Sequence, residues 1–207
     1  METMKPIIET IIDEYKIMEY TGTNIYVIEN ILDESTCNEF ISVIETQELS
    51  DTINEKDKLL KCKYMELDRH NIEHQAMDYK IYSLFHKIFG IIIKTNPYIR
   101  ITGDTYYILR KIYGETKLHT DEVRANHKNL FFNQTRCLAA IIALNDDFDG
   151  GIFKFPHQKI EHKMKKGSVI LFPPFWTHPH EITTVGKNQY RYTITTWGTE
   201  PIITTNT

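Results

Sequence analysis

The feature that most constrains the fold of this chain is the series of short β-type runs that follows Pro97. Each run is rich in β-branched and aromatic residues, and Gly, Asn, Asp or Pro separates it from the next. The runs cover residues 105–112, 136–144, 152–155, 168–172 and 190–197. Strand-sized segments at this frequency predict a β sandwich or a small barrel.

Before Pro97 the pattern indicates helices. Apolar residues recur at helical spacing within residues 5–18, which predicts a first helix. A strand is predicted at 24–32, after which Asp33 is placed to cap a helix over residues 34–46. Residues 72–89 carry an apolar stripe that predicts a longer helix. We therefore expect an α+β, mainly β protein whose N-terminal helices pack against one sheet.

The size and composition predict one globular domain, residues 1–207. Hydrophobic residues make up 41% of the chain, and no repeat or linker stands out. We divide the domain into a mainly helical support at residues 1–97, a β core at 98–198 and a tail at 199–207. The polar residues 47–58 are expected to form a loop.

The charge and the cysteines restrict the class of protein. The formal net charge of -4 gives no reason to expect nucleic-acid binding. The three cysteines form no CxxC motif and are typical of reduced thiols inside a cell. Acidic residues near the N-terminus argue against a secretory signal, and the longest apolar run, 88–93, is too short to span a bilayer. We expect a cytoplasmic protein without a membrane partner.

Two motifs contain the residues of a metal site. His119 and Asp121, in the triplet HTD, lie two residues apart after a β-type run, so they would share one face of a strand. The stretch 171–182 contains His178 and His180 on either side of a proline. Two histidines and one carboxylate form the facial triad that binds Fe(II) and leaves positions open. The local pattern does not decide between His178 and His180.

The last β-type run contains an arginine among apolar and hydroxyl residues. Strand alternation predicts that one face of this strand carries Arg191, Thr193, Thr195 and Trp197. The opposite face would carry Tyr192, Ile194 and Thr196. A buried arginine is costly unless an anion pairs with it. A carboxylate ligand would pair bidentately with Arg191, with Thr195 beside it as a hydroxyl donor. The alternative is an edge-strand arginine whose head lies in solvent.

In their order along the chain, these pieces resemble a known family. HTD, the segments 149–156 and 166–174, the second histidine motif and the final Arg-to-Trp strand are similar to the Fe(II)- and 2-oxoglutarate-dependent dioxygenases, in the branch of the prolyl hydroxylases. The resemblance covers residues 100–198. It implies a double-stranded β-helix, which is a cupin-like jelly roll, with Fe(II), 2-oxoglutarate and dioxygen, and with ascorbate as the reductant. The implied reaction is hydroxylation of a C–H bond, first of a prolyl residue in a peptide or protein, and otherwise of another side chain or a small molecule.

The resemblance also implies roles for single residues. The metal ligands would be His119, Asp121 and His180, and Arg191 would bind the distal carboxylate of 2-oxoglutarate. The same pocket would include Thr195, Trp197 and Tyr107, with Tyr106 and Tyr113 as alternatives to Tyr107. Gly150 and Gly151 match a turn of the family. The chain departs from the family at Ala143, where a tyrosine often contacts 2-oxoglutarate.

Several other interpretations stay open. Lys187 could replace Arg191, although its segment predicts a solvated turn. Residues 70–74 fit the HxxEH motif of one group of metalloproteases. The triad also suits zinc in a binding module without turnover. The lysine-rich segment 154–166 is either the wet face of a hairpin or a basic wall for an acidic substrate. Residues 122–135 lie where a loop would cover the substrate.

A nucleic-acid demethylase of the same superfamily is disfavoured. Such proteins usually carry a second arginine shortly after the anchor, and residues 192–200 contain none.

Overall fold

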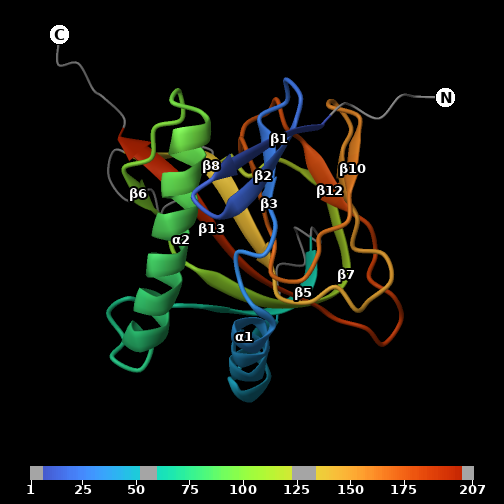
Figure 1. Ribbon diagram of the computed structural model, residues 1–207. Helices are drawn as coiled ribbons and strands as arrows, with labels where there is room; N and C mark the ends of the chain where they lie inside the picture. The colour runs from blue at the N-terminus through green and yellow to red at the C-terminus, as the bar shows by residue number, and fades with distance from the viewer. Residues whose placement is uncertain (1–6, 52–59, 123–133, 202–207) are drawn as a thin grey trace, which may run out of the picture.

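The computed structural model describes residues 7–51, 60–122 and 134–201, which form a mainly β structure (Figure 1). The helices among these residues are α1 (Glu34–Thr46) and α2 (Gln75–Thr95). The strands are β1 (Ile7–Ile12), β2 (Tyr15–Tyr20), β3 (Ile25–Ile28), β4 (Ser50–Asp51), β5 (Leu60–Glu66), β6 (Gly103–Asp104), β7 (Ile108–His119), β8 (Gln134–Ala143), β9 (Phe153–Phe155), β10 (Ile160–His162), β11 (Val169–Phe172), β12 (His180–Ile182) and β13 (Arg191–Pro201). The expectation of a mainly β protein is confirmed.

The strands form one antiparallel sheet that curls back on itself (Figure 1). Their order is β1-β2-β3-β11-β8-β13-β7-β12-β9-β10, with β5 also on β7, β4 on β5 and β6 on β13. The early strand β3 pairs with the late strand β11, so the N-terminal strands β1–β3 belong to the same sheet as the later strands. A curled antiparallel sheet of this kind is jelly-roll-like.

Strand alternation gives the sheet two different faces. Along β8, one set of side chains joins a core under α2, namely Leu138, Ala140 and Ile142. The alternate set, Ala139, Ile141 and Ala143, joins a second core inside the curl. Helix α2 covers the first face with a buried stripe that includes Ile81, Phe85, Ile88 and Ile92. The second face is therefore free to line a cavity.

The prediction of a helix at residues 5–18 is wrong. β1 and β2 form a hairpin there, in which Ile12 pairs with Tyr15 and the turn residue Asp13 has a φ of 53°. Ile7, Ile8 and Ile11 are 47%, 50% and 76% exposed, so they make no buried helical stripe. β-Branched side chains favour a pleated strand over a helix. Both helices follow strands, which corrects the expected helical N-terminal support.

The other two predicted helices are present. α1 spans its predicted residues, and the Asp33 carboxylate accepts a hydrogen bond from Thr36 N at 2.7 Å, as expected of an N-cap. α2 begins and ends later than predicted, and stops before Pro97. Of the expected loop at 47–58, the described part includes β4, and 52–58 lie outside the described residues. The expected tail begins as strand, because β13 continues to Pro201.

The described residues contain the helices α1 and α2, and neither is both long enough and apolar enough to cross a bilayer.

A double-glycine turn precedes β9 and lies beside Arg191. Gly150 and Gly151 have φ values of +69° and +63°, a region that side chains other than glycine rarely adopt. A Cβ on Gly150 would lie 1.9 Å from the carbonyl oxygen of Thr184. A Cβ on Gly151 would lie 2.4 Å from the Phe148 ring and 3.4 Å from Arg191 Cδ. Glycine at both positions lets this turn pack tightly beside Arg191.

We expect Phe85→Ala to lower the free energy of unfolding by about 3–5 kcal/mol, because it opens a cavity where α2 meets the sheet. Phe85 is fully buried, and its ring stacks on Tyr107 with centroids 5.8 Å apart. Urea unfolding followed by circular dichroism measures the change. Tyr79→Ala on the same helix is the control, since Tyr79 is 71% exposed. A similar loss in both variants would contradict the packing described.

Candidate metal centre and adjoining pocket

The sheet brings together three side chains that the sequence separates. His119 ends β7, His180 begins β12, and these two residues pair directly across the strands. Asp121 follows two residues after His119, with His119 Nε2 at 3.3 Å from its Oδ1. One ligand atom from each of the three side chains lies within 4.8 Å of the others. Among the described residues, this is the group of histidine, cysteine and acidic side chains with the geometry to hold a metal ion.

Backbone carbonyls orient both imidazoles. His119 Nδ1 donates to Lys117 O at 2.8 Å, and His180 Nδ1 donates to His178 O at 3.2 Å. Carbonyl oxygens can only accept, so each Nδ1 carries a proton and each Nε2 is left for the metal. Trp197 Nε1 donates to Asp121 Oδ2 at 3.1 Å, and the other oxygen, Oδ1, lies beside His119 Nε2, where it could serve as a metal ligand.

The site holds one negative charge and one neutral imidazole. Burial would raise the pKa of Asp121, but the hydrogen bond and charge of His119, together with the hydrogen bond from Trp197, hold it well below its usual range. Burial lowers the pKa of His180 to about 4, so its ring is neutral near pH 7. Burial also opposes a charge on His119, but the hydrogen bond to Asp121 outweighs it and raises the His119 pKa. Of the two imidazoles, His119 therefore holds a proton more readily than His180 in the metal-free site.

The geometry separates the two histidines that the sequence left undecided. His178 Nε2 donates to Thr23 O at 2.7 Å, and its Nδ1 accepts from Thr177 Oγ1 at 2.8 Å. Both ring nitrogens are thus engaged away from His119 and Asp121. The structure places His180, and not His178, beside the other two members of the triad.

A cavity of about 260 Å³ adjoins the triad. The predicted face of β13 lines it with Arg191, Thr193, Thr195 and Trp197, and Ile194 on the opposite face joins the core under α2. The face assignment made for this strand is confirmed. The cavity is also lined by Arg110 of β7 and Arg136 of β8.

Arg191 is a buried cation that lacks a counter-charge among the described residues. Its side chain belongs to a residue that is 4% exposed, and its Nε has no hydrogen-bond partner. It forms no ion pair within the described part of the chain. Burial and the neighbouring charge of Arg110 lower its pKa to about 9, so the guanidinium is still charged near pH 7. Such a group fits an anionic ligand in the cavity.

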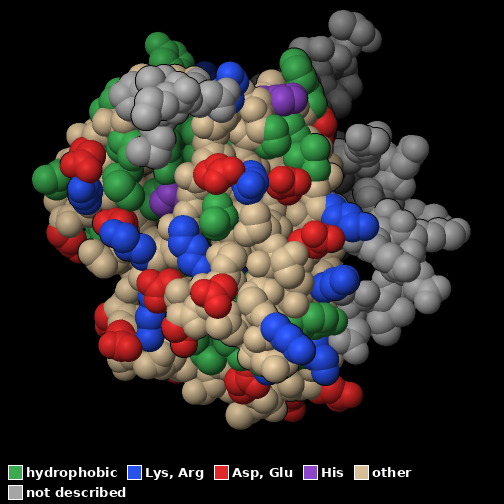
Figure 2. Space-filling view, turned by 90° about the vertical axis from the view of Figure 1, so that its right-hand side faces the viewer, with side chains coloured by type: hydrophobic (Ala, Val, Ile, Leu, Met, Phe, Trp, Pro, Cys, Tyr) green, Lys and Arg blue, Asp and Glu red, His purple; other side chains and the backbone are tan. Residues whose placement is uncertain are grey.

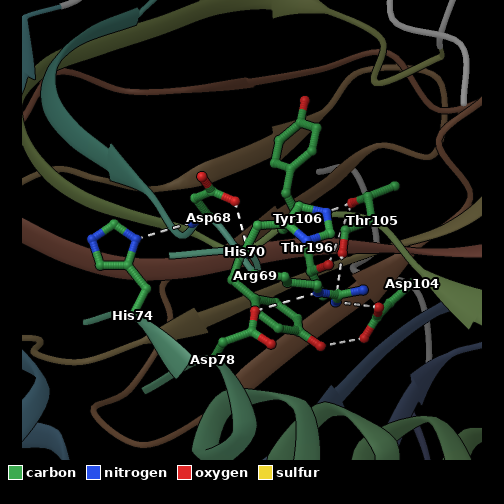
Figure 3. Close-up of polar contacts among 10 residues, drawn as sticks. Asp68, Arg69, His70, His74, Asp78, Asp104, Thr105, Tyr106 and Thr196 are labelled. Carbon is green, nitrogen blue, oxygen red and sulfur yellow. Dashed lines mark hydrogen bonds and ion pairs between the residues drawn. The ribbon is translucent and has the colours of Figure 1, made fainter. Parts of the chain in front are cut away.

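Tyr107 does not reach the cavity, which corrects its predicted place there. It is fully buried in the core under α2, where it stacks on Phe85 and donates to Asp104. The Arg69 guanidinium lies over its ring and bonds Asp104 at 2.6 Å (Figure 3). Tyr106 lies closer, since its hydroxyl accepts from Arg136 and its ring meets Trp197 edge-on. Tyr113 is 43% exposed.

The alternative interpretation of residues 70–74 as the metal motif of a metalloprotease is wrong. His70 and His74 precede α2, so they do not lie one helical turn apart. His74 Nδ1 accepts from Asp68 N at 3.0 Å, and Figure 3 shows the His70 and His74 rings well apart. Asp68 in turn accepts from His70 N at 2.9 Å. This segment forms the turn that leads into α2.

The lysines of residues 154–166 do not form an unpaired basic wall. Lys154 lies 3.0 Å from Glu161, Lys165 is 2.7 Å from Glu29, and Lys166 is 3.0 Å from Glu34. Lys163 donates to the carbonyls of Phe148 and Gly150. Acidic and basic side chains are also intermixed on the face of the molecule shown in Figure 2. Lys187 is exposed in a turn and does not line the cavity beside the triad.

Sequence reasoning missed Arg110 and Arg136. Arg136 stacks on Trp197, 3.7 Å from the ring centroid, and donates to the carbonyl of Asp121 at 2.9 Å. It therefore holds the segment that carries the triad carboxylate. Arg110 donates to Thr195 Oγ1 at 2.7 Å. The one available signal was a charged residue inside a β-type run, as at Arg191. Most of the expected substrate loop, residues 123–133, lies outside the described residues.

Comparisons with known proteins agree with this geometry. The sequence model of the 2OG-Fe(II) oxygenase superfamily matches residues 107–199. No curated protein sequence gives a significant match.

Solved structures share the fold at low sequence identity. A viral collagen prolyl hydroxylase from Paramecium bursaria Chlorella virus-1, in a 2OG complex, is 16% identical with a TM-score of 0.64, over 86% of this chain and 97% of that one. A Pseudomonas putida prolyl-4-hydroxylase is 15% identical with a TM-score of 0.63, over 86% and 92%. A Trichoplax adhaerens prolyl hydroxylase, in complex with a hypoxia inducible factor peptide fragment, is 17% identical with a TM-score of 0.65, over 86% and 84%. At these identities the likeness shows the fold alone.

We expect metal binding to release a proton where the pH lies below the raised pKa of His119, because the metal must displace the proton that His119 shares with Asp121. Since the pKa of His119 is raised, affinity should fall roughly tenfold per pH unit once the pH drops below that pKa. Calorimetric titration with Zn(II) or Mn(II), in buffers of different ionisation enthalpy from pH 6 to 8, measures both effects. His86→Ala, an exposed position on α2, is the control. An affinity independent of pH over this range would contradict the electrostatics described.

Proposed function

We propose that this protein is a 2-oxoglutarate-dependent dioxygenase that hydroxylates a C–H bond, because residues 107–199 match the sequence model of the 2OG-Fe(II) oxygenase superfamily. The observation that carries the proposal is the pairing of two sites in one cavity. A two-histidine, one-carboxylate set lies at one end, and the unpaired guanidinium of Arg191 lies in the same cavity wall. The two-histidine, one-carboxylate set suits iron, and the guanidinium suits a carboxylate of a dicarboxylate co-substrate.

The residues present fit the groups that the family implies. In the proposal His119, Asp121 and His180 hold Fe(II), and Arg191 binds the distal carboxylate of 2-oxoglutarate. The two Nε2 atoms and Asp121 Oδ1 converge, and the buried Arg191 Nε lacks the acceptor that a carboxylate would supply. When bound, iron, 2-oxoglutarate and dioxygen supply the oxidising power that inserts one oxygen atom into a C–H bond, with succinate and carbon dioxide as co-products.

The chain's own contribution is orientation and exclusion of water. Lys117 O and His178 O fix the two imidazole rings, and Trp197 fixes the Asp121 carboxylate. Thr195 Oγ1 accepts from Arg110, so its own hydroxyl proton is free to be donated into the cavity. Ile141, Ile182 and Trp197 give the wall its apolar part and keep water from the bound groups.

We propose a prolyl residue in a peptide or protein as the substrate. Support comes from the structural neighbours, which are prolyl hydroxylases, one of them in complex with a peptide fragment. Another amino-acid side chain or a small molecule is the second candidate for the same chemistry. Ascorbate as the reductant of the iron belongs to the same proposal.

The finer fold assignment is also part of the proposal. We propose a double-stranded β-helix that forms a single domain over residues 1–207, with its catalytic core at 98–198. The pairing of β3 with β11 supports a single domain, because it joins the N-terminal strands to this core.

A metal-binding module without turnover is the competing function. The triad alone would serve it, since the same donor set binds zinc. A buried, unpaired Arg191 beside the triad favours the enzyme, because a binding module gains nothing from that cost.

Succinate formation from 2-oxoglutarate with Fe(II) and candidate prolyl peptides is the direct assay. Asp121→Ala should abolish it, because the triad loses its only anionic ligand. Arg191→Met should raise the KM for 2-oxoglutarate roughly 10- to 150-fold, the loss expected of a charge-assisted pair. Lys187→Met, in the exposed turn, is the matched control. Tight metal binding with no 2-oxoglutarate turnover on any peptide would favour the binding module.

A second pair of variants tests the choice of histidine. We expect His180→Ala to lose metal affinity and His178→Ala to keep it, since both ring nitrogens of His178 bond within the protein. Calorimetric titration with Mn(II) measures the metal affinity of each variant without any turnover, and circular dichroism checks that each variant folds. Loss of metal only in His178→Ala would overturn the proposed triad.

A further inference from the structure

Arg110 is a second arginine in the same cavity, and it is half-buried there. It lines the cavity with Arg191 and forms no ion pair among the described residues. Burial lowers its pKa, and its charge in turn lowers the pKa of Arg191, so the two guanidiniums lie close enough to repel. Two cations held together out of water are costly unless an anion binds between them.

Strand register explains how Arg110 comes to face the cavity. Thr193 of β13 pairs with Arg110 of β7 on one side and with Ala143 of β8 on the other. These three residues therefore form one row across the sheet and share a face. Arg191 lies one step along the same face, opposite Ile112. Arg110 and Arg191 are thus diagonal neighbours whose side chains enter the same space.

The row has only one hydrogen-bond donor long enough to reach a ligand. Ala143 has no polar side-chain group, and Thr193 is short and fully buried. Arg110 carries five N–H donors, of which one is given to Thr195 Oγ1 at 2.7 Å. Thr193 and Ala143 are small, so they leave the space that the Arg110 side chain and a ligand would share.

We infer that Arg110 binds the distal carboxylate of 2-oxoglutarate together with Arg191, so that two guanidinium groups clamp the co-substrate. This rests on the proposed function and names a further residue for it. The clamp makes the pocket specific for a 2-oxo acid with a second carboxylate. It also places Thr195 between Arg110 and the ligand, with the threonine oxygen accepting from one and its hydroxyl donating to the other.

The test is calorimetric binding of 2-oxoglutarate to the full chain loaded with Zn(II), which binds without turnover. Arg110→Met should weaken binding roughly 10- to 150-fold, as expected when charge-assisted hydrogen bonds are lost, and Arg110→Lys should restore part of it. Binding of 2-oxobutyrate, which lacks the distal carboxylate, should change less than about threefold. Lys111→Met is the matched control, because Lys111 is the next residue on β7 and bonds Glu45 outside the cavity at 2.8 Å.

A thermal readout separates binding from folding. Without ligand, Arg110→Met should melt at or above the wild-type temperature, because it removes a desolvated and repelled charge. With saturating 2-oxoglutarate, the upward shift seen in the wild type should shrink in this variant.

The outcomes are distinguishable. If the Zn(II)-loaded wild type binds no 2-oxoglutarate, the proposed function fails. A second outcome is that the wild type binds 2-oxoglutarate, Arg191→Met does not, and Arg110→Met binds it like the wild type. In that case the proposed role of Arg110 is overturned and the proposed function stands. Equal weakening of 2-oxoglutarate and 2-oxobutyrate by Arg110→Met would place Arg110 at the metal end and overturn the clamp.

Discussion

The register of β13 is the constraint on which the rest of the structure depends. This strand pairs with β7 on one side and β8 on the other, so its backbone is fixed in the middle of the sheet. Ile194 packs into the core under α2, while Arg191 and its alternate neighbours face the cavity. A slip of one residue would drive the arginine into that hydrophobic core and turn Ile194 to the cavity. Burial of apolar surface under α2 therefore fixes the side on which the charged pocket forms.

The cavity is electrostatically asymmetric, and this asymmetry matches a metal-bound dianion. Asp121 supplies negative charge at the metal end, where its pKa is held low, and Arg110 and Arg191 supply positive charge along the wall. The positive end is costly to the free protein, because both guanidiniums are desolvated and each repels the other. Natural proteins tolerate such a cost where a ligand removes it, and the large cores on both faces of the sheet can offset it.

Much of the β core could be predicted from the sequence, because its signals are local. Alternation gave the faces of β13, and short runs between turn residues gave most strands. The N-terminal hairpin was missed because isoleucines at 7, 8, 11 and 12 fit a helical spacing while their β-branched side chains favour strands. The place of His178 could not be predicted, since it depends on a bond to Thr23 across the fold. Tyr107 faces α2 because it shares a face with Leu109 in the core under α2, while Ile108 and Arg110 lie on the opposite face.

Arg110 was missed for a geometric reason that also explains how one strand serves both ends of the cavity. Arg110 and His119 are separated by an odd number of positions, so a regular strand would place them on opposite faces. The pairing of β7 with β12 is irregular: His180 pairs with His119, but Ile182 pairs with Thr116. An extra residue on β7 between these pairs shifts its alternation, as a β-bulge does. Arg110, Ile112 and Thr116 then face the cavity before the bulge and His119 faces it after. The bulge is what lets β7 carry a guanidinium and an imidazole of the proposed metal site into one space.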